Sequence, residues 1–184
     1  MRVVGGRLKG RNLASPSSRD IRPTADRLRE SLFNILLHSY DDPLAGARVL
    51  DLFAGTGALG IEAISRGAAF VLFIDNGAEA RALLRNNVEA LGLGGVTKVY
   101  RRDASDLGPA HPVEPFSLVF LDPPYRMKLA EKALVSLREG GWLAAGALLV
   151  VEEAKAAQFA APEGFQELER RVYDDTEFVF LRSG

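Results

Sequence analysis

The stretch Asp51-Leu-Phe-Ala-Gly55-Thr-Gly57-Ala-Leu-Gly60 decides the fold of this 184-residue chain. Apolar residues around its start predict a buried strand over 48–53, and the apolar positions after it predict a helix over 58–66. The glycines between them have the GxGxxG spacing, which lets a loop approach a ligand closely at the start of a helix. A strand, a glycine loop and a helix in this order indicate a nucleotide-type ligand at the loop rather than a purely structural turn.

Strands and helices alternate in the rest of the chain. Further strands are predicted over 70–75, 96–101, 116–121, 147–152, 166–173 and 176–182, and further helices over 79–91 and 128–139. Strands that alternate with helices form βαβ units and a parallel sheet. The last two strands are separated only by Asp174-Asp175, so we expect an antiparallel hairpin at the C-terminal edge. The sequence therefore predicts an α/β fold with a doubly wound, mostly parallel sheet.

The first 46 residues do not follow this alternation. Two short apolar and basic runs, 2–4 and 7–13, flank Gly5-Gly6, and this pattern predicts a β-hairpin. A helix is expected to open at Pro23-Thr24 with Thr24 as its N-cap, because apolar residues recur after it at helical spacing. We therefore predict a small hairpin-and-helix appendage over 1–46 and a larger domain over 47–184.

The charge of the chain is distributed unevenly. Residues 1–30 contain eight basic and three acidic residues, a net charge of +5, which leaves −6 for the remainder of a chain whose total is −1. A basic arm on an acidic body is typical of a protein that docks one end onto a polyanion. A solvated surface arm is the alternative interpretation.

The composition limits the metal sites and the compartment. The sequence has no cysteine and only two histidines, His38 and His111, so we expect no zinc or haem site. It has no apolar run long enough to span a membrane, and the residues after Met1 lack the apolar stretch of a signal peptide. These features predict a soluble, cytoplasmic protein that binds no metal.

Asp51 distinguishes between two ligands that the glycine loop could hold. A dinucleotide such as NAD carries an anionic pyrophosphate, which a carboxylate directly before the loop would repel. S-adenosylmethionine carries a positive sulfonium and ammonium, which the same carboxylate would attract; a helix or loop cap is the other interpretation of Asp51. With S-adenosylmethionine in the site, Asp75 would accept the ribose hydroxyls. Asp103 is placed to meet the adenine amine, and equally to cap a short helical segment over 104–107.

A second motif, Asp122-Pro123-Pro124-Tyr125, follows the predicted strand over 116–121. Prolines have no N–H and hold the preceding residue extended, so this turn presents acceptors without the usual donors. We predict that Asp122 and the Pro123 carbonyl accept the hydrogens of a planar amine and so direct its lone pair toward a methyl group. Tyr125 would stack on the base. A proline-rich surface turn is the alternative, and the sequence leaves open whether Asp122 also takes the proton.

Together these motifs resemble those of the amino methyltransferases with the Rossmann-like class I S-adenosylmethionine-dependent fold. The N-terminal part narrows the resemblance, because Arg2-Val-Val-Gly-Gly6, Lys9-Gly-Arg11 and the run from Arg22-Pro-Thr24 to Leu36 are similar to the RsmD family. That family methylates the exocyclic N2 of one guanine in bacterial small-subunit (16S) rRNA. The resemblance covers nearly the whole chain, with several motifs in the same order.

The resemblance implies a role for each matching residue. The catalytic motif would be Asp122, Pro123, Pro124 and Tyr125. The cofactor-binding residues would be Asp51, Phe53, Ala54, Gly55, Gly57, Asp75, Asn76, Asp103 and Ala104, with Asp75 in the place of the glutamate usual in the family. The RNA-facing residues would be Arg2, Arg7, Lys9, Arg11, Arg22, Thr24 and Arg27. Asn86 and Asn87 sit where the family's helix carries an asparagine, and we assign them no role beyond structure.

The resemblance also implies the partners. The substrate would be 16S rRNA, within a small-subunit assembly intermediate, with the target base unpaired or flipped out. The enzyme would be a monomer. The residues leave three other interpretations open: a methyltransferase for adenine or cytosine amines in DNA or RNA, an NAD-dependent oxidoreductase, and a nucleic-acid-binding module without catalysis. Asp51 and the lack of an obvious hydride-transfer acid disfavour the oxidoreductase, and the intact Asp122 motif disfavours the binding module.

Overall fold

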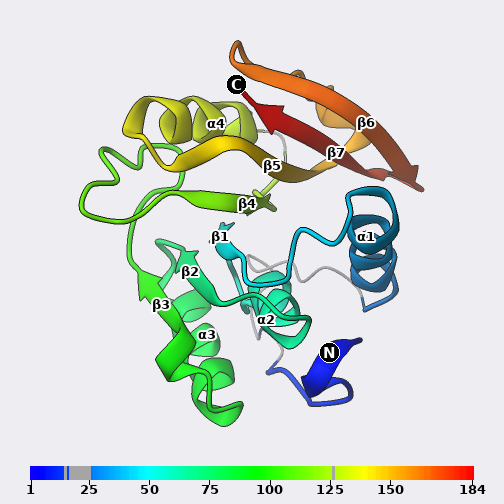
Figure 1. The fold of residues 1–184 in the computed structure, drawn as a ribbon, viewed down its shortest axis with the longest axis vertical. Coiled ribbons are helices and arrows are strands. Elements are labelled where there is room, and N and C mark those ends of the chain that lie inside the picture. Colours follow the sequence, from blue (N-terminus) through cyan, green and yellow to red (C-terminus); the bar gives the residue numbers. More distant parts are fainter. Residues whose placement is uncertain (15, 17–25, 126) are drawn as a thin grey trace.

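A seven-stranded sheet forms the centre of the structure, a computed structural model that describes residues 1–14, 16, 26–125 and 127–184. The strands are β1 (Arg48–Leu52), β2 (Phe70–Ile74), β3 (Thr97–Tyr100), β4 (Phe116–Leu121), β5 (Leu143–Ala154), β6 (Phe165–Tyr173) and β7 (Thr176–Ser183). Their order is β3-β2-β1-β4-β5-β7-β6, and β1 to β5 pair in parallel. β7 runs antiparallel to both β5 and β6 at the C-terminal edge (Figure 1). The predicted α/β fold, mostly parallel with an antiparallel edge, is confirmed.

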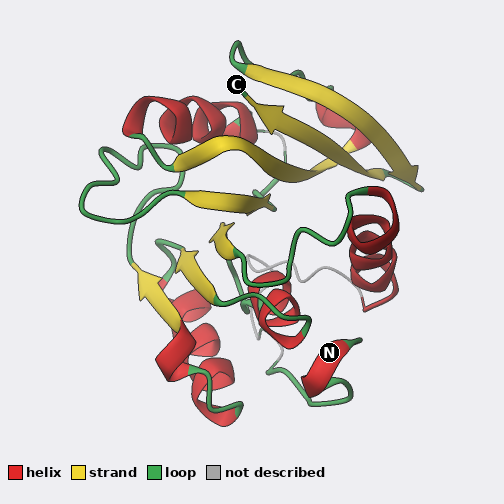
Figure 2. Cartoon of the chain, in the orientation of Figure 1, coloured by secondary structure: helices red, strands yellow, loops and turns green. Residues whose placement is uncertain are grey.

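Helices cover both faces of the sheet. They are α1 (Asp26–Ser39), α2 (Ala58–Ser65), α3 (Ala78–Ala90) and α4 (Leu129–Gly140), with short 3-10 helices η1 (Gly6–Leu8), η2 (Gly94–Val96) and η3 (Lys155–Ala157). α4 lies on the opposite side of the sheet from α1 and α2 (Figure 2). Along β1, Val49 joins the core cluster that includes α1 and α2, whereas Leu50 joins the cluster that includes α4. Because alternate strand residues point to opposite faces, each central strand contributes to both cores.

The elements match the predicted ranges closely, and two boundaries differ for identifiable reasons. β1 ends at Leu52 because Phe53, predicted as its last residue, has a left-handed backbone with φ of 56°. β5 begins at Leu143, before the predicted residue 147. A register shift in its pairing with β4 lets the earlier part of β5 pair with Phe116. The extra residues of β5 between these two pairs form an irregularity of the bulge type, which bends a strand without ending it.

The N-terminal residues reverse direction, as predicted, but not at the predicted turn. Arg2 and Asn12 form an antiparallel bridge, and the N–H of Val3 donates to the carbonyl of Arg11 at 3.0 Å. The prediction of a tight turn at Gly5-Gly6 is wrong, because η1 makes the reversal. Residues 1–14 contain this single bridge rather than a regular two-stranded hairpin.

Helix α2 explains this irregular backbone. The Glu62 carboxylate accepts the N–H groups of Val4 and Gly5 at 3.0 and 2.9 Å. The Ser65 hydroxyl accepts the N–H of Leu8 at 2.9 Å. The N-terminal backbone therefore bonds to helix side chains in place of a partner strand.

Helix α1 places one of the N-terminal basic residues inside the protein. The predicted helix start at Pro23-Thr24 lies outside the described residues, within which α1 begins at Asp26. Arg29 is 0% exposed, and its guanidinium lies 2.9 Å from the Asp26 carboxylate and 3.4 Å from that of Glu62. Its charge is therefore balanced internally, and Arg29 is not part of the exposed basic surface of the arm.

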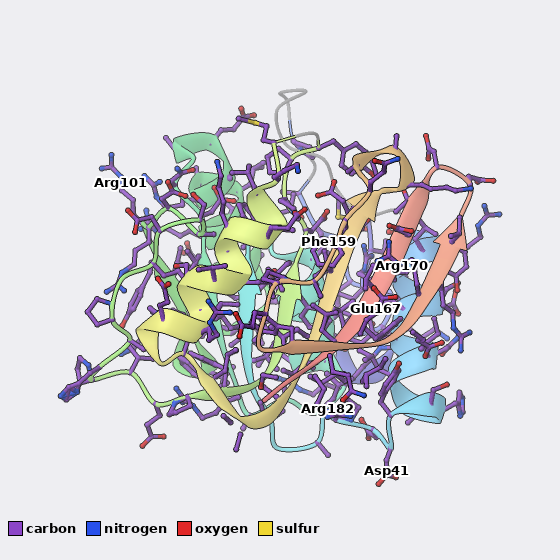
Figure 3. The ribbon with its side chains drawn as sticks, turned by 90° about the horizontal axis from the view of Figure 1, so that it is seen from above. Asp41, Arg101, Phe159, Glu167, Arg170 and Arg182 are labelled. Carbon is purple, nitrogen blue, oxygen red and sulfur yellow. The ribbon has the colours of Figure 1, made fainter. Side chains whose placement is uncertain are left out.

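The loop that follows β5 is fastened to the edge strand β6. Arg170 of β6 donates to the carbonyl of Phe159 at 3.0 Å (Figure 3). The same guanidinium pairs with Glu167 at 2.6 Å and with Glu177 of β7 at 2.7 Å. These contacts hold the chain between η3 and β6 against the C-terminal hairpin.

We expect Gly60→Ala to lower the free energy of unfolding by about 1–3 kcal/mol, because overpacking a core displaces its neighbours. A Cβ at Gly60 of α2 would lie 2.4 Å from a ring carbon of Phe73 and 2.8 Å from a methyl carbon of Val71, both in β2. Gly94→Ala is the control, because a Cβ there meets nothing within 4 Å. Urea unfolding that gives both variants the same stability would contradict this packing.

Candidate active site

The carboxyl ends of β1, β2 and β4 meet at one edge of the sheet. Leu52 of β1 pairs in register with Ile74 of β2 and with Leu121 of β4. The residues that follow these partners, Asp75 and Asp122, therefore leave the sheet on either side of β1 at the same edge. Ligands of open α/β sheets bind at this edge.

The glycine loop turns sharply away from β1. Phe53, Gly55 and Gly57 have φ values of 56°, 59° and 82°, a left-handed region that is uncommon for a residue such as Phe53. The N–H of Ala54 donates to the carbonyl of Ile74 at 3.1 Å, and the N–H of Gly57 donates to that of Ala54 at 2.8 Å. The structure thus brings four predicted cofactor residues together in one tight turn.

Asp75 is bonded directly to this loop. Its Oδ2 accepts the N–H of Gly55 at 3.0 Å, and its Oδ1 accepts the N–H of Gly77 at 2.8 Å. The side chain is partly exposed, and its neighbour Asn76 is exposed. Since a carboxylate offers about four acceptor positions, Asp75 keeps capacity for hydroxyl donors of a ligand.

Asp51 lies beneath the loop rather than on its surface. Its side chain is 1% exposed, and its Oδ2 accepts the N–H of Gly60 at 2.9 Å, so it caps the start of α2. Burial raises the pKa of Asp51 to about 8; the Gly60 bond opposes this shift, and repulsion by the Asp75 carboxylate adds to it. The structure therefore contains the capping contact that the sequence offered as an alternative, and contact between Asp51 and a cationic ligand stays a prediction.

We expect Asp51→Asn to change how stability depends on pH. The folded protein keeps the Asp51 proton up to about pH 8, whereas the unfolded chain releases it near pH 3.8. The free energy of unfolding of the wild type therefore falls as pH rises through this window, and the variant lacks this loss. Relative to the wild type, the melting temperature of the variant should rise by about 4 °C or more between about pH 5 and about pH 8. A constant difference in calorimetry would exclude a buried, protonated carboxyl.

Asp103 closes a turn after β3. Its Oδ1 accepts both the N–H and the hydroxyl of Ser105, at 2.9 and 2.7 Å, and its carbonyl accepts the N–H of Asp106 at 3.0 Å. Residues 104–107 form a turn, so the helical segment considered there is wrong. Asp103 is exposed and Ala104 is buried. Their contact with an adenine stays a prediction.

The motif Asp122-Pro123-Pro124-Tyr125 lies directly beyond the end of β4. Asp122 is partly buried, with its Oδ1 enclosed, and Pro123 is buried. The Tyr125 hydroxyl lies 3.0 Å from the hydroxyl oxygen of Thr176 at the start of β7. This contact links the tyrosine to the C-terminal hairpin at the carboxyl edge of the sheet.

The predicted RNA-facing residues that the structure describes lie on the surface. They are Arg2, Arg7, Lys9, Arg11 and Arg27. Arg22 and Thr24 fall outside the described residues. Arg11 donates to the carbonyl of Ala90 at the end of α3, at 3.3 Å, which sets the arm beside that helix.

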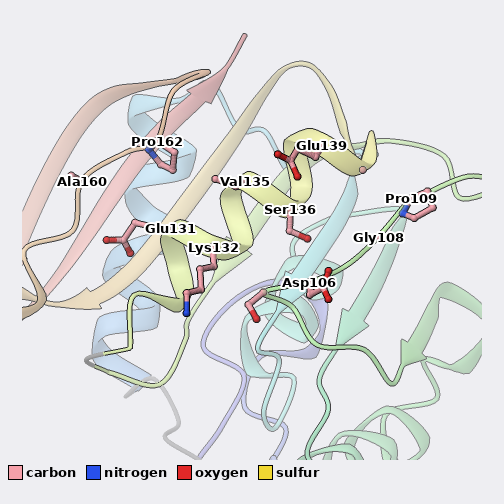
Figure 4. Close-up of a pocket in the computed structure, with 12 residues that line it drawn as sticks. Asp106, Gly108, Pro109, Glu131, Lys132, Val135, Ser136, Glu139, Ala160 and Pro162 are labelled. Atoms are coloured by element: carbon pink, nitrogen blue, oxygen red, sulfur yellow. The ribbon is translucent and has the colours of Figure 1, made fainter.

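A separate hollow of about 660 Å³ lies over α4 (Figure 4). It is lined by Ser105, Asp106, Gly108, Pro109, Glu131, Lys132, Val135, Ser136, Glu139, Gly140, Ala160 and Pro162. None of these is a predicted catalytic, cofactor-binding or RNA-facing residue, although Ser105 bonds to Asp103. Its charged side chains have both signs, and they select no class of ligand.

Metal-type clusters and long apolar helices are absent from the part of the chain that the structure describes. Within residues 1–14, 16, 26–125 and 127–184, histidine, aspartate and glutamate side chains do not gather in groups of three or more that could hold a metal ion. Over the same ranges, every helix is too short or too polar to cross a bilayer.

Three buried polar residues support the site and were not predicted. Thr176 contacts Tyr125, Glu62 holds the N-terminal backbone, and Asn87 of α3 donates to the carbonyl of Thr56 in the glycine loop at 2.9 Å. The available signal was a polar residue at a buried position, which was strongest for Glu62 in the apolar helix α2. The partners of these residues are distant in sequence, and the pattern does not reveal them.

Known proteins resemble the chain over most of its length. A family model described as Conserved hypothetical protein 95 matches residues 1–182. The ribosomal RNA small subunit methyltransferase D of Escherichia coli (strain K12) is 41% identical over 152 residues, which cover 83% of this chain and 74% of that protein. The protein of the same name from Haemophilus influenzae is 35% identical over 174 residues, which cover 94% of this chain and 88% of that protein.

Solved structures agree with this assignment. The Escherichia coli protein yhhF superposes with a TM-score of 0.84 and 32% identity, covering 100% of this chain and 97% of its own. A hypothetical protein from Thermus thermophilus has a TM-score of 0.76 and 34% identity, covering 98% of both chains. The chain therefore belongs to the RsmD family and has the class I methyltransferase fold.

Proposed function

We propose that this protein transfers a methyl group from S-adenosylmethionine to the exocyclic N2 of a guanine in small-subunit (16S) ribosomal RNA. The observation that carries the proposal is the shared edge of the sheet, where Asp75 with the glycine loop lies on one side of β1 and Asp122 on the other. A methyl donor at the first position would stand beside an amine at the second. The names of the relatives in Escherichia coli and Haemophilus influenzae support ribosomal RNA as the substrate.

The residues around the glycine loop fit S-adenosylmethionine. Asp75 has acceptor capacity for ribose hydroxyls, and the exposed Asp103 has it for the adenine amine. Burial and the nearby Asp75 carboxylate raise the pKa of Asp51; a positive charge beside both carboxyl groups would lower this pKa and favour the carboxylate, whereas a pyrophosphate would raise it further. When bound, S-adenosylmethionine supplies an electrophilic methyl group to a nucleophile.

The Asp122 motif suits a planar amine. The Asp122 carboxylate and the Pro123 carbonyl can each accept one hydrogen of an NH2 group, and the two prolines add no competing N–H. Fixing the nitrogen in this way favours a tetrahedral geometry and directs its lone pair out of the ring plane. The contact with Thr176 orients Tyr125, which we expect to stack on the base.

A second carboxylate beside Asp122 supports guanine as the base. Glu152 follows Val151 of β5, which pairs with Leu121 of β4, so Glu152, within β5, lies beside Asp122, the residue just after β4. Val150 belongs to the core cluster of the α1 face, and the strand alternation puts Glu152 on that face with Asp122. Guanine carries an N1–H donor next to its amine, whereas adenine and cytosine carry an acceptor nitrogen there. Two carboxylates therefore favour guanine.

The exposed basic arm supports a large RNA partner. A guanine paired inside a helix hides its amine, so the target base must be unpaired or flipped out. Cations on the arm would neutralise phosphates near that base and position the protein on the RNA. We propose that the substrate is a small-subunit assembly intermediate, that the enzyme acts as a monomer, and that it works in the cytoplasm, where ribosomal subunits assemble.

Incubation with labelled S-adenosylmethionine tests the proposed function. The full chain would be mixed with free 16S rRNA and with small-subunit particles, both lacking the modification, and the labelled nucleotide would then be mapped. Label on N2 of a single guanine is the expected result. Label on an adenine or cytosine amine would show that the proposed target base is wrong. Absence of label despite bound cofactor would overturn the proposal of methyl transfer. The better of the two substrates identifies the state of the RNA on which the enzyme acts.

We expect a variant with Arg7, Lys9 and Arg11 changed to glutamine to bind 16S rRNA more weakly. The slope of log Kd against log salt should fall by roughly 2–3. Each phosphate contact releases about one counterion on binding, and the variant lacks three such contacts. Binding titrations at several salt concentrations measure this slope. A charge-matched control neutralises three exposed cations on other elements, Lys98, Arg138 and Arg182. Equal slopes for both variants would remove the arm from the RNA interface.

A further inference from the structure

Asn87 of α3 bonds to both the N-terminal arm and the glycine loop. The proposed function assigns RNA to the arm and S-adenosylmethionine to the loop. Its side chain is 3% exposed, and both ends of its amide are bonded. The Oδ1 accepts the N–H of Ala14, in the N-terminal arm, at 2.7 Å. The Nδ2 donates to the carbonyl of Thr56, in the glycine loop, at 2.9 Å. One buried amide thus connects the arm with the cofactor loop.

The arm approaches the same loop residue from its other end. The hydroxyl of Thr56, itself 3% exposed, lies 3.8 Å from the sulfur of Met1. The N–H of Leu13 donates to the carbonyl of Met1 at 2.9 Å, so the two ends of residues 1–14 are held together. Thr56 is therefore linked to the arm directly at Met1 and through Asn87, and movement of either the arm or the loop disturbs these contacts.

The remaining anchors of the arm belong to α2, which starts directly after the glycine loop. The hydroxyl of Ser65 donates to the carbonyl of Gly5 at 2.6 Å, and Glu62 holds the neighbouring N–H groups. These bonds fix the start of the arm to the body of the protein. Asn87 differs from them because it bonds the arm and the loop with one side chain, at the point where the arm leads into the segment that carries Arg22 and Thr24.

We propose that Asn87 is a positioning residue that couples cofactor binding to RNA binding. This inference rests on the proposed function. If either the arm or the loop leaves its position, a buried donor or acceptor of the amide loses its partner, which is costly. A ligand that holds the loop therefore favours the placed arm, and a ligand that holds the arm favours the placed loop. By thermodynamic linkage, each ligand increases the affinity of the protein for the other ligand by the same factor.

The coupling can be measured as a ratio of dissociation constants. The Kd of S-adenosylhomocysteine would be determined for the full chain, alone and with saturating unmodified 16S rRNA transcript. We expect the RNA to tighten binding of the wild type by about fivefold or more. The reciprocal titration, of RNA with and without S-adenosylhomocysteine, should give the same factor.

Two substitutions of Asn87 separate the contributions of its two hydrogen bonds. Asn87→Ala removes both bonds and should reduce the coupling factor to about one. Asn87→Asp keeps an acceptor for the N–H of Ala14 but loses the donor to Thr56, so it should retain most of the RNA affinity while losing the coupling. Because aspartate is nearly isosteric with asparagine, this variant also serves if the alanine variant does not fold. Asn86→Ala, an exposed neighbour in the same helix, is the matched control and should keep the coupling of the wild type.

Each outcome decides between the two claims. Wild-type protein that binds both ligands without coupling, or an Asn87→Ala variant that keeps the full coupling, would overturn the role of Asn87 and leave the proposed function intact. Wild-type protein that fails to bind S-adenosylhomocysteine would overturn the proposed function and this inference with it. Equal loss of affinity for each ligand alone, with the coupling unchanged, would reduce Asn87 to a structural residue.

Discussion

Replacement of Asp122 by alanine should lower kcat for methyl transfer on the order of 10²–10³-fold, the loss typical when a group that stabilises a transition state is removed. Asp122 is the carboxylate at the end of β4 that would hold the amine, and the remaining Pro123 carbonyl can accept only one of its hydrogens. The affinity for S-adenosylmethionine should stay within about twofold, because the glycine loop and Asp75 lie across β1 from this residue. Single-turnover kinetics with calorimetric binding separates the two effects.

Two further variants make this test specific. Asp122→Asn keeps one acceptor oxygen but presents an NH2 group to the substrate amine, so it should be nearly as impaired as the alanine variant. Asp41→Asn changes an exposed carboxylate in the loop before β1, at the end of the sheet where the parallel strands begin (Figure 3), and should retain full activity. An Asp122→Ala variant with wild-type kcat would remove Asp122 from the reaction.

Replacement of Glu62 by glutamine should lower the free energy of unfolding by roughly 3–5 kcal/mol, the usual cost of breaking a buried ion pair. Glu62 is 0% exposed, and its carboxylate lies 3.4 Å from Nε of Arg29 and 2.8 Å from Nε of Arg66. The glutamine NH2 would meet guanidinium and backbone donors, so Arg29 would keep a buried charge with less compensation. Urea unfolding measures the loss.

Two comparisons separate burial from charge. Glu167→Gln removes a carboxylate from a partly exposed pair with Arg170, which keeps Glu177 as a partner, and should change stability by less than about 1 kcal/mol. A double variant, Arg29→Met with Glu62→Leu, should recover only part of the lost stability: it removes the buried charge of Arg29, but Arg66 and the N–H groups of Val4 and Gly5 still lose the Glu62 carboxylate. A Glu62→Gln variant as stable as Glu167→Gln would show that the internal pair contributes little.

The fold could be predicted because its signals are local. Apolar strands, helices that end at glycines and the glycine loop each lie within a dozen or so consecutive residues, the range over which hydrophobic periodicity is informative. The carboxyl edge followed from topology alone, since strand ends meet there in any doubly wound sheet. The sequence analysis placed Asp75 and Asp122 at the ends of two predicted strands, and the structure brings those strand ends to one edge of the sheet.

The contacts that surround the site could not be predicted because they join distant segments. An arginine such as Arg29 is expected on the surface. It is buried here because it pairs with Glu62, which lies in a different helix and is distant in sequence. The prediction of a turn at Gly5-Gly6 was wrong for the same reason. Side chains of α2 supply the hydrogen bonds that a partner strand would have made. The raised pKa of Asp51 likewise depends on how α2 packs over the strand.

The bond between Tyr125 and Thr176 implies an order in which the carboxyl edge of the sheet is assembled. β7 follows all the other described strands in the chain, yet it lies inside the sheet, between β5 and β6. During synthesis the glycine loop and Asp122 leave the ribosome well before Thr176 does, so a nascent chain contains both before the tyrosine ring has its support. A partly synthesised chain therefore lacks this contact, and Tyr125 gains its support only after the C-terminal hairpin has joined the sheet.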